Sequence, residues 1–157
     1  MSGRQREVDT RRERYIAALV ANEAGYSYKI TTQFASFDAC FYTYDFKSQE
    51  RVVVEVAEIK AREMCHDKFP RGIFLDYIKL AALSSHMDMR PEVYFVIGCY
   101  DGIFKAILTR ARISSLDIAL EGRKGRDDKY DIEPVGLIPV EWFIKCSEVY
   151  NLREIVE

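Results

Sequence analysis

The stretch Val52-Val53-Val54-Glu55-Val56-Ala57-Glu58-Ile59-Lys60 decides the fold around it. Its β-branched residues predict a buried strand whose end carries two charged side chains. Because a strand alternates its faces with a period of two, Glu58 and Lys60 point to the same side. An acid and a lysine in this position are costly to desolvate unless something compensates them. A divalent cation and a phosphate would compensate both.

Length and composition predict one domain, residues 1–157, with a core of its own. The longest apolar runs are shorter than the roughly 20 residues of a membrane helix. The basic N-terminus lacks the apolar stretch of a signal peptide, so we expect a cytoplasmic protein with no membrane partner. The net charge of −2 counts mildly against a protein that binds a polyanion over its whole surface.

Cysteine spacing gives no metal framework, because the four cysteines form no CxxC pair. Cys65-His66-Asp67 contains zinc-ligand types, but no second cluster follows at a suitable spacing. Ordinary surface or core roles are therefore favoured for these residues.

Basic residues gather in two segments, which are either solvated surfaces or phosphate contacts. Both interpretations stay open at this point. The members of the two groups are Arg4, Arg6, Arg11, Arg12 and Arg14, and Arg110, Arg112, Arg123, Lys124 and Arg126.

Periodicity predicts an α/β fold with a mixed central sheet flanked by helices. The expected order is helix, three strands, helix, two strands and a tail. Gly25 ends the first helix, and Asp101-Gly102 marks a turn. The predicted helices are 8–24, about 70–85 and a short one at 139–143; the predicted strands are 27–33, 37–45, 51–61, 93–100, 103–113 and 135–139, with a charged loop at 122–129.

The pattern acid-x-Lys occurs three times, so the tripeptide alone carries little information. Asp45-Phe46-Lys47 falls in a predicted turn, and Asp127-Asp128-Lys129 falls in the charged loop. Only Glu58-Ile59-Lys60 ends an apolar strand, which makes it the candidate for chemistry.

A second carboxylate, Asp38, can reach this pair. If 37–45 and 51–61 form a hairpin with a three- or five-residue loop, Asp38 lies opposite residue 58 or 60 on the same face. The β-carbons would then be about 5 Å apart. A slip of one residue would turn Asp38 away. Asp45 would lie roughly 23 Å along the strand.

Glu23 is a third candidate acid. It follows Ile16 and Val20 at helical i, i+4, i+7 spacing, so it projects from the apolar edge of the first helix. The alternative is a glutamate solvated at the last turn.

The combination of Asp38 with Glu58-Ile59-Lys60 resembles the PD-(D/E)XK nuclease superfamily. Glu23 resembles the additional helix-borne acid of Holliday-junction-resolvase-like and phage members. The element order is similar to the αβββαβ restriction-endonuclease-like core over residues 10–113, and residues 114–157 look like an extension. Phe37-Asp38 departs from the Pro-Asp of the family pattern.

The resemblance implies a Mg²⁺- or Mn²⁺-dependent nuclease acting on DNA, encoded by a phage or mobile element and, if encoded by a phage, working in the host cytoplasm. Its metal ligands would be Asp38, Glu58, the Ile59 carbonyl and Glu23, which suit a hard cation. Lys60 would orient the attacking water or neutralise the phosphate. A homodimer that cuts two strands is a further expectation.

Further basic residues could bind the nucleic acid. Arg62 continues the face of Lys60 and either clamps a phosphate or is solvated. Lys79, on the next helix, either joins the site or pairs with Asp76 on the surface. The remaining candidates are Arg12, Arg110 and Arg112.

Two other functions stay open. The fold could be a catalytically silent module that binds nucleic acid or protein, or a structural domain in which Glu58 and Lys60 form an ordinary ion pair. Three charges that are costly to desolvate together argue against a silent site.

Overall fold

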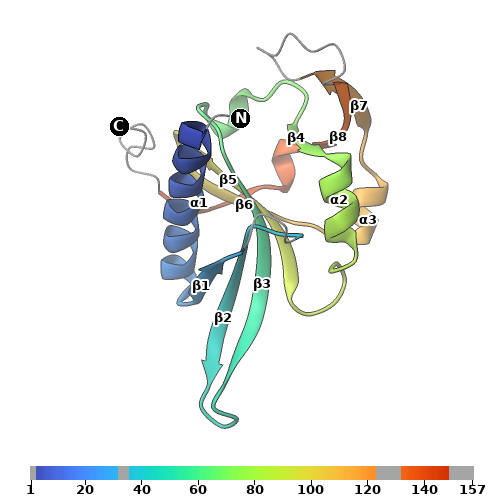
Figure 1. Ribbon diagram of the computed structural model, residues 1–157. Coiled ribbons are helices and arrows are strands. Elements are labelled where there is room, and N and C mark those ends of the chain that lie inside the picture. The colour runs from blue at the N-terminus through green and yellow to red at the C-terminus, as the bar shows by residue number, and fades with distance from the viewer. Residues whose placement is uncertain (1–2, 32–35, 123–131, 149–157) are drawn as a thin grey trace.

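The computed structural model describes residues 3–31, 36–122 and 132–148. These residues form two sheets and three α-helices (Figure 1). The elements are α1 (Gly3–Ala24), β1 (Ser27–Ile30), β2 (Ala39–Asp45), β3 (Glu50–Ala61), η1 (His66–Lys68), β4 (Ile73–Asp76), α2 (Tyr77–Ser84), β5 (Glu92–Cys99), β6 (Gly102–Ile107), α3 (Arg110–Ser114), β7 (Ile118–Gly122), β8 (Ile132–Ile138), η2 (Val140–Trp142) and β9 (Ile144–Ser147).

The main sheet has six strands in the order β1-β2-β3-β5-β6-β9. Strands β3 and β5 are parallel, and every other neighbouring pair is antiparallel. Parallel neighbours need a crossover connection, which here contains η1, β4 and α2. The predicted α/β class with a mixed sheet flanked by helices is confirmed.

Helix α1 covers one face of this sheet. Its residues Ile16, Ala17, Val20 and Ala21 are buried against alternate residues of β3, including Ile59. The helix ends as predicted at Gly25, which has a positive φ of 73°. The N–H of Tyr26 donates to the carbonyl of Ala21 at 2.8 Å, and the N–H of Gly25 donates to Asn22 at 3.4 Å. This pair of hydrogen bonds is a Schellman C-cap, which needs the left-handed residue.

The opposite face is covered by α2 and by a small antiparallel sheet in the order β4-β8-β7 (Figure 1). Leu80 and Leu83 of α2 pack with Ile138 of β8 and with Phe95 of β5. Strand β9 adds the last strand to the edge of the main sheet beside β6. None of the helices in the described part of the chain could span a membrane.

Two predicted elements were wrong in part. The helix expected from about Pro70 begins only at Tyr77, because Ile73 and Leu75 face the core with strand periodicity and lie in a strand paired with β8. The strand expected at 103–113 ends at Ile107. Thr109 then caps α3, its side chain accepting a hydrogen bond from the N–H of Arg112.

The predicted loop at 122–129 lies outside the described residues from position 123 on, together with Arg123, Lys124, Arg126 and the acid-x-Lys at 127/129.

The register of β2 on β3 contains one irregularity. At the start of β2 the ladder pairs Ala39 with Ala57, and at the turn it pairs Asp45 with Glu50. The connecting turn has four residues, 46–49, instead of the three or five expected. The ladder shifts between Phe41 and Tyr42, where Val54 is the extra residue of β3. Such a bulge places two residues of one strand opposite one of the other.

Candidate active site

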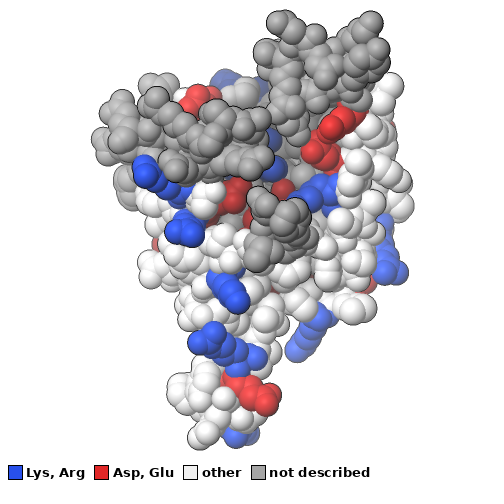
Figure 2. Space-filling view, in the orientation of Figure 1, with Lys and Arg blue, Asp and Glu red and all other residues white. Residues whose placement is uncertain are grey.

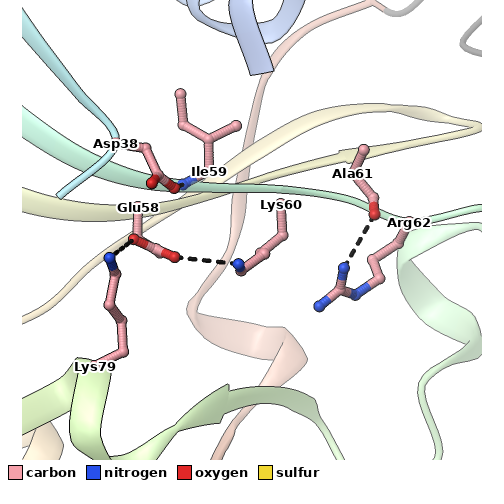
Figure 3. A network of polar contacts seen from close by, with 7 residues as sticks. All are labelled: Asp38, Glu58, Ile59, Lys60, Ala61, Arg62 and Lys79. Carbon is pink, nitrogen blue, oxygen red and sulfur yellow. Dashed lines mark hydrogen bonds and ion pairs between the residues drawn. The ribbon is translucent and has the colours of Figure 1, made fainter. Parts of the chain in front are cut away.

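Asp38 lies directly before β2, where that strand leaves the side of β3. Its backbone N–H donates to the carbonyl of Ala57 at 2.9 Å. Its carboxylate oxygen Oδ2 accepts a hydrogen bond from the N–H of Ile59 at 2.8 Å. The side chain thus takes the place of a strand carbonyl at the end of the ladder. This contact fixes the carboxylate beside the end of β3 (Figure 3).

Glu58 is the buried member of the site and is only 2 % exposed. Two lysines approach its carboxylate from different elements (Figure 3). Nζ of Lys60 lies 3.3 Å from Oε1, and Nζ of Lys79 lies 3.1 Å from Oε2. The Lys79 contact has ion-pair distance without hydrogen-bond geometry, so Oε2 is buried with no hydrogen bond from the described residues. A buried carboxylate oxygen in this state is costly.

The electrostatics of Glu58 follow from this environment. Burial raises its pKa from 4.5 to about 7, and the charge of Asp38 adds to the increase. Lys60 and Lys79 lower the pKa but do not cancel these two effects. Two carboxylates that repel each other and a carboxylate oxygen without a hydrogen bond form a site that a divalent cation would stabilise.

The backbone of Ile59 faces the same place. In an antiparallel pair, a residue directs its N–H and its C=O to the same neighbouring strand. Since the Ile59 N–H donates to Asp38, its carbonyl is directed to the Asp38 side, beyond the start of β2. Three of the four expected ligands, Asp38, Glu58 and the Ile59 carbonyl, are therefore brought together.

Lys79 reaches the site because α2 packs on this face of the sheet. Leu80 and Leu83 anchor the helix in the core, and Lys79 extends from its first turn to Glu58. The sequence left open whether Lys79 joins the site or pairs with Asp76 on the surface. In the structure Lys79 contacts the buried Glu58.

Glu23 is not brought to this site. It is exposed at the end of α1, which packs on the opposite face of the sheet. Burial raises the pKa of Cys146 on β9, and the charges of Glu55 and Glu23 add to the increase, so Glu23 lies toward β9. Strand β9 is three strands from β3, which corresponds to about 14 Å.

The predicted phosphate-binding arginines fall into two groups. Arg62 follows Lys60 along the same face, and its Nη1 donates to the carbonyl of Ala61 at 3.0 Å (Figure 3). Arg110 is exposed on α3, and its Nε donates to the carbonyl of Ser84 at 3.4 Å. Arg12 and Arg112 form the second group, whose side chains contact a carboxylate or an aromatic ring of the fold.

Arg12 is only 9 % exposed, and its Nη2 lies 2.9 Å from Oε1 of Glu63. Arg112 donates to the carbonyl of Ile107 at 3.0 Å and lies over the ring of Trp142. A phosphate contact by either side chain would require breaking these contacts.

A second group of possible metal ligands lies at the end of the β5–β6 hairpin. His66, Asp67 and Asp101 offer ligand atoms within 4.8 Å of one another. Nδ1 of His66 is 2.5 Å from Oδ2 of Asp101, and the His66 ring stacks on Phe104. Sequence spacing missed this group because Asp101 is 35 residues from His66. The Asp101-Gly102 pattern predicts that Asp101 lies in a turn, but it does not indicate that His66 is its partner.

The fold and this site define the class of protein. A mixed sheet with helices on both faces, an acid-x-Lys at the end of a central strand and an aspartate just before the neighbouring strand resemble the arrangement of PD-(D/E)XK nucleases. Residues 4–146 match the family described as "Phage putative PDDEXK endonuclease", and the chain belongs to this family. The resemblance found in the sequence is thereby confirmed. A comparison with curated proteins gave no match.

Proposed function

We propose that the protein is a divalent-metal-dependent nuclease that hydrolyses phosphodiester bonds in DNA. The observation that carries this proposal is the buried Glu58 carboxylate, placed beside Asp38 and between Lys60 and Lys79. The host cytoplasm is the expected place of action for a phage enzyme of this type.

Asp38, Glu58 and the Ile59 carbonyl would hold Mg²⁺ or Mn²⁺, since all three offer the hard oxygen ligands that these ions prefer. The cation would stabilise charge on the scissile phosphate and lower the pKa of a bound water. Glu23 is left out of the proposed set because α1 lies on the other face.

The lysines have different tasks in this proposal. Lys60 is 38 % exposed and lies at the open side of Glu58, where it can orient the attacking water or neutralise charge on the phosphate. Lys79 is less exposed, and its charge favours the ionised form of Glu58 that a cation needs. Arg62 and Arg110 are proposed to contact neighbouring phosphates.

The test compares wild type with Lys60→Ala on single-stranded, double-stranded and branched DNA, in Mg²⁺, in Mn²⁺ and in EDTA. We expect metal-dependent cleavage by wild type and loss of cleavage by the variant, with DNA binding retained. Cleavage that persists in Lys60→Ala would contradict the assigned site. RNA of matched sequence tests the choice of DNA, and sedimentation tests the expected homodimer.

The chain contains a matched control pair. Glu55 also lies on β3, is 8 % exposed, and has Nζ of Lys105 3.4 Å from Oε1. Glu55 and Glu58 are an odd number of residues apart on β3, so Glu55 points to the other face of the sheet, which α1 covers. Lys105→Ala and Glu55→Gln therefore remove an equivalent ion pair from the other side of the sheet, and we expect both variants to cleave like wild type.

The second candidate function is a silent binding module. It is favoured by the fact that Glu58 already has two lysine partners without a cation. Binding of DNA without cleavage in either metal, with equal affinity in EDTA, would support the silent module over the nuclease.

A further inference from the structure

The hairpin formed by β2 and β3 extends well beyond the rest of the molecule (Figure 1). Strand β1 pairs with β2 only as far as Tyr42, and β5 pairs with β3 only from Glu55. Residues 43–54 therefore form a two-stranded ribbon whose two outer edges are unpaired among the described strands. We call this segment the hairpin arm.

Alternation along β2 determines which side chains of the arm share a face with the active site. Cys40, Tyr42 and Tyr44 are alternate residues of β2, so they point to one side. Cys40 pairs with Val56, which lies on the same face of β3 as Glu58, so this is the active-site side. Cross-strand partners share a face, which places Val53, opposite Tyr42, and Arg51, opposite Tyr44, on that side. The guanidinium of Arg51 lies 5.1 Å from the centre of the Tyr42 ring, in agreement with this placement.

The charges of the arm are separated between its two faces. Arg51 lies on the active-site side, and Lys29 of β1 joins it because Lys29 pairs with Cys40. The acids Asp45 and Glu50 pair with each other on the opposite side. Figure 2 shows basic side chains along this projecting part, and both acidic and basic side chains close to its tip. The side that continues from the active site is therefore the cationic side.

Large apolar side chains are exposed along the same ribbon. Tyr44 is 49 % exposed and Phe46 is 85 % exposed, and the two rings are in edge contact with their centres 5.2 Å apart. Val53 is 40 % exposed. Exposed aromatic residues beside arginine are typical of surfaces that bind a partner.

We propose that the active-site side of the hairpin arm binds the DNA duplex that flanks the cleaved bond, through Arg51 and Tyr44. This inference rests on the proposed function. Arg51 supplies a cation for a phosphate, and the Tyr44 hydroxyl is a donor of the kind that contacts the sugar-phosphate backbone. The arm has the form that enters a major groove, since the groove admits a two-stranded β-ribbon.

The length of the arm predicts where it binds. Glu58 is seven positions after Arg51, or six ladder steps when the extra residue Val54 is not counted, which is about 20 Å of strand. At about 3.4 Å per base pair, the Arg51 contact lies roughly six base pairs from the cleaved phosphate. A duplex that ends closer than this to the cleavage position cannot reach Arg51.

The experiment measures binding of fluorescent duplexes by anisotropy in Ca²⁺ and in EDTA, and cleavage in Mg²⁺. One duplex extends at least twelve base pairs to each side of the mapped cleavage position, and a second ends three base pairs from it on the side facing the arm. Arg51→Ala and Tyr44→Ala are compared with Glu50→Gln and Thr43→Ala, which change the opposite face of the same ribbon. Circular dichroism verifies that all four variants fold.

On the long duplex, Arg51→Ala should raise Kd and KM roughly tenfold with kcat unchanged, and should reduce the salt dependence of binding by about one ion. On the short duplex, wild type and Arg51→Ala should be equal, and the opposite-face variants should match wild type on both. Equal Kd for wild type and Arg51→Ala on the long duplex would overturn the proposal. A change in sedimentation behaviour without a change in Kd would do the same, because it would show that the arm binds a second copy.

The binding measurement separates this proposal from the proposed nuclease activity. Wild type that cleaves no duplex but binds long duplexes more tightly than Arg51→Ala does would refute the activity and support the arm. Wild type that cleaves with no dependence on Arg51 or on flank length would refute the arm and support the activity.

Discussion

Nζ of Lys79 lies 3.1 Å from Oε2 of Glu58, and this ion pair connects α2 to the end of β3. The contact places a helix-borne cation beside a carboxylate that burial and Asp38 make hard to ionise. Removing the Lys79 charge has two opposing effects on the binding of a metal cation. It removes the repulsion between the lysine and the cation, and it raises the pKa of Glu58, so that a proton competes more strongly with the cation.

We therefore expect Lys79→Met to make metal binding more strongly pH-dependent. Near pH 8.5, Glu58 is ionised in wild type, and Mn²⁺ affinity of the variant should equal or exceed that of wild type. Near pH 6.5, the proton competes more effectively in the variant. The ratio of Mn²⁺ affinities at the two pH values, measured by calorimetry, should be at least about fivefold larger in Lys79→Met, since one unit of pKa is a factor of ten. Lys105→Met is the control, and an unchanged ratio in Lys79→Met would contradict the expected role.

Asp38→Asn and Asp38→Ala should separate the two roles of this side chain. The amide oxygen of asparagine can still accept the N–H of Ile59, whereas alanine leaves that N–H without its acceptor. We expect Asp38→Ala to lower the free energy of unfolding by about 1–3 kcal/mol, and Asp38→Asn to lower it by much less. Both variants should lose the increase in melting temperature that Mg²⁺ or Mn²⁺ gives wild type. Equal stabilities in EDTA would show that the hydrogen bond to Ile59 contributes little.

The stability of the metal-free protein should depend on pH through Glu58. Because the pKa of the folded state is raised from 4.5 to about 7, the folded state binds this proton more tightly than the unfolded state. The cost of the buried charge is absent below about pH 4.5, grows as the pH rises, and is complete above about pH 7. This difference in pKa corresponds to roughly 3 kcal/mol.

Glu58→Gln should remove that cost. Denaturant unfolding in EDTA at pH 5 and pH 8 should show a smaller loss of stability with rising pH in the variant than in wild type. Subtracting the two proteins cancels the other titrating groups. A parallel pH dependence in both would mean that Glu58 is not the group responsible, and Glu55→Gln is the comparison on the opposite face.

The central part of the fold could be predicted from the sequence because its signals are local. The apolar run that ends at Glu58-Ile59-Lys60 gave a strand, and Gly25 gave the end of α1. The strand expected at 103–113 runs past Thr109, although the N-cap of α3 is a local signal. The helix expected from Pro70 failed for a non-local reason. Ile73–Asp76 forms a strand only because β8, some sixty residues later, supplies its partner, and no local pattern contains that information.

The position of Asp38 shows the same limit in the site itself. With the four-residue turn at 46–49 and an uninterrupted ladder, Asp38 would lie opposite Ala57 and point to the α1 face. With the extra residue Val54, the ladder instead pairs Ala39 with Ala57, and Asp38, directly before the strand, comes next to residue 58. The sequence prediction reached this placement with a three- or five-residue turn and no bulge, so its conclusion about the face depended on two errors that compensate each other. Glu23 was expected at the site because it continues the apolar edge of α1. Helical spacing does not reveal which face of a sheet the helix covers, and α1 covers the face opposite Glu58.

Deleting Val54 should separate the active site from the hairpin arm. The deletion removes the extra residue while keeping the pairs Phe41–Glu55 and Tyr42–Val53, so Asp38 should stay beside Glu58. The bend and added twist of a bulged strand should be lost, which redirects the arm. We expect the metal-induced increase in melting temperature to match wild type, while Kd for the long duplex rises about as much as in Arg51→Ala. Loss of the metal effect would instead show that the bulge itself holds the carboxylates together, since the pairing on its site side would then have slipped.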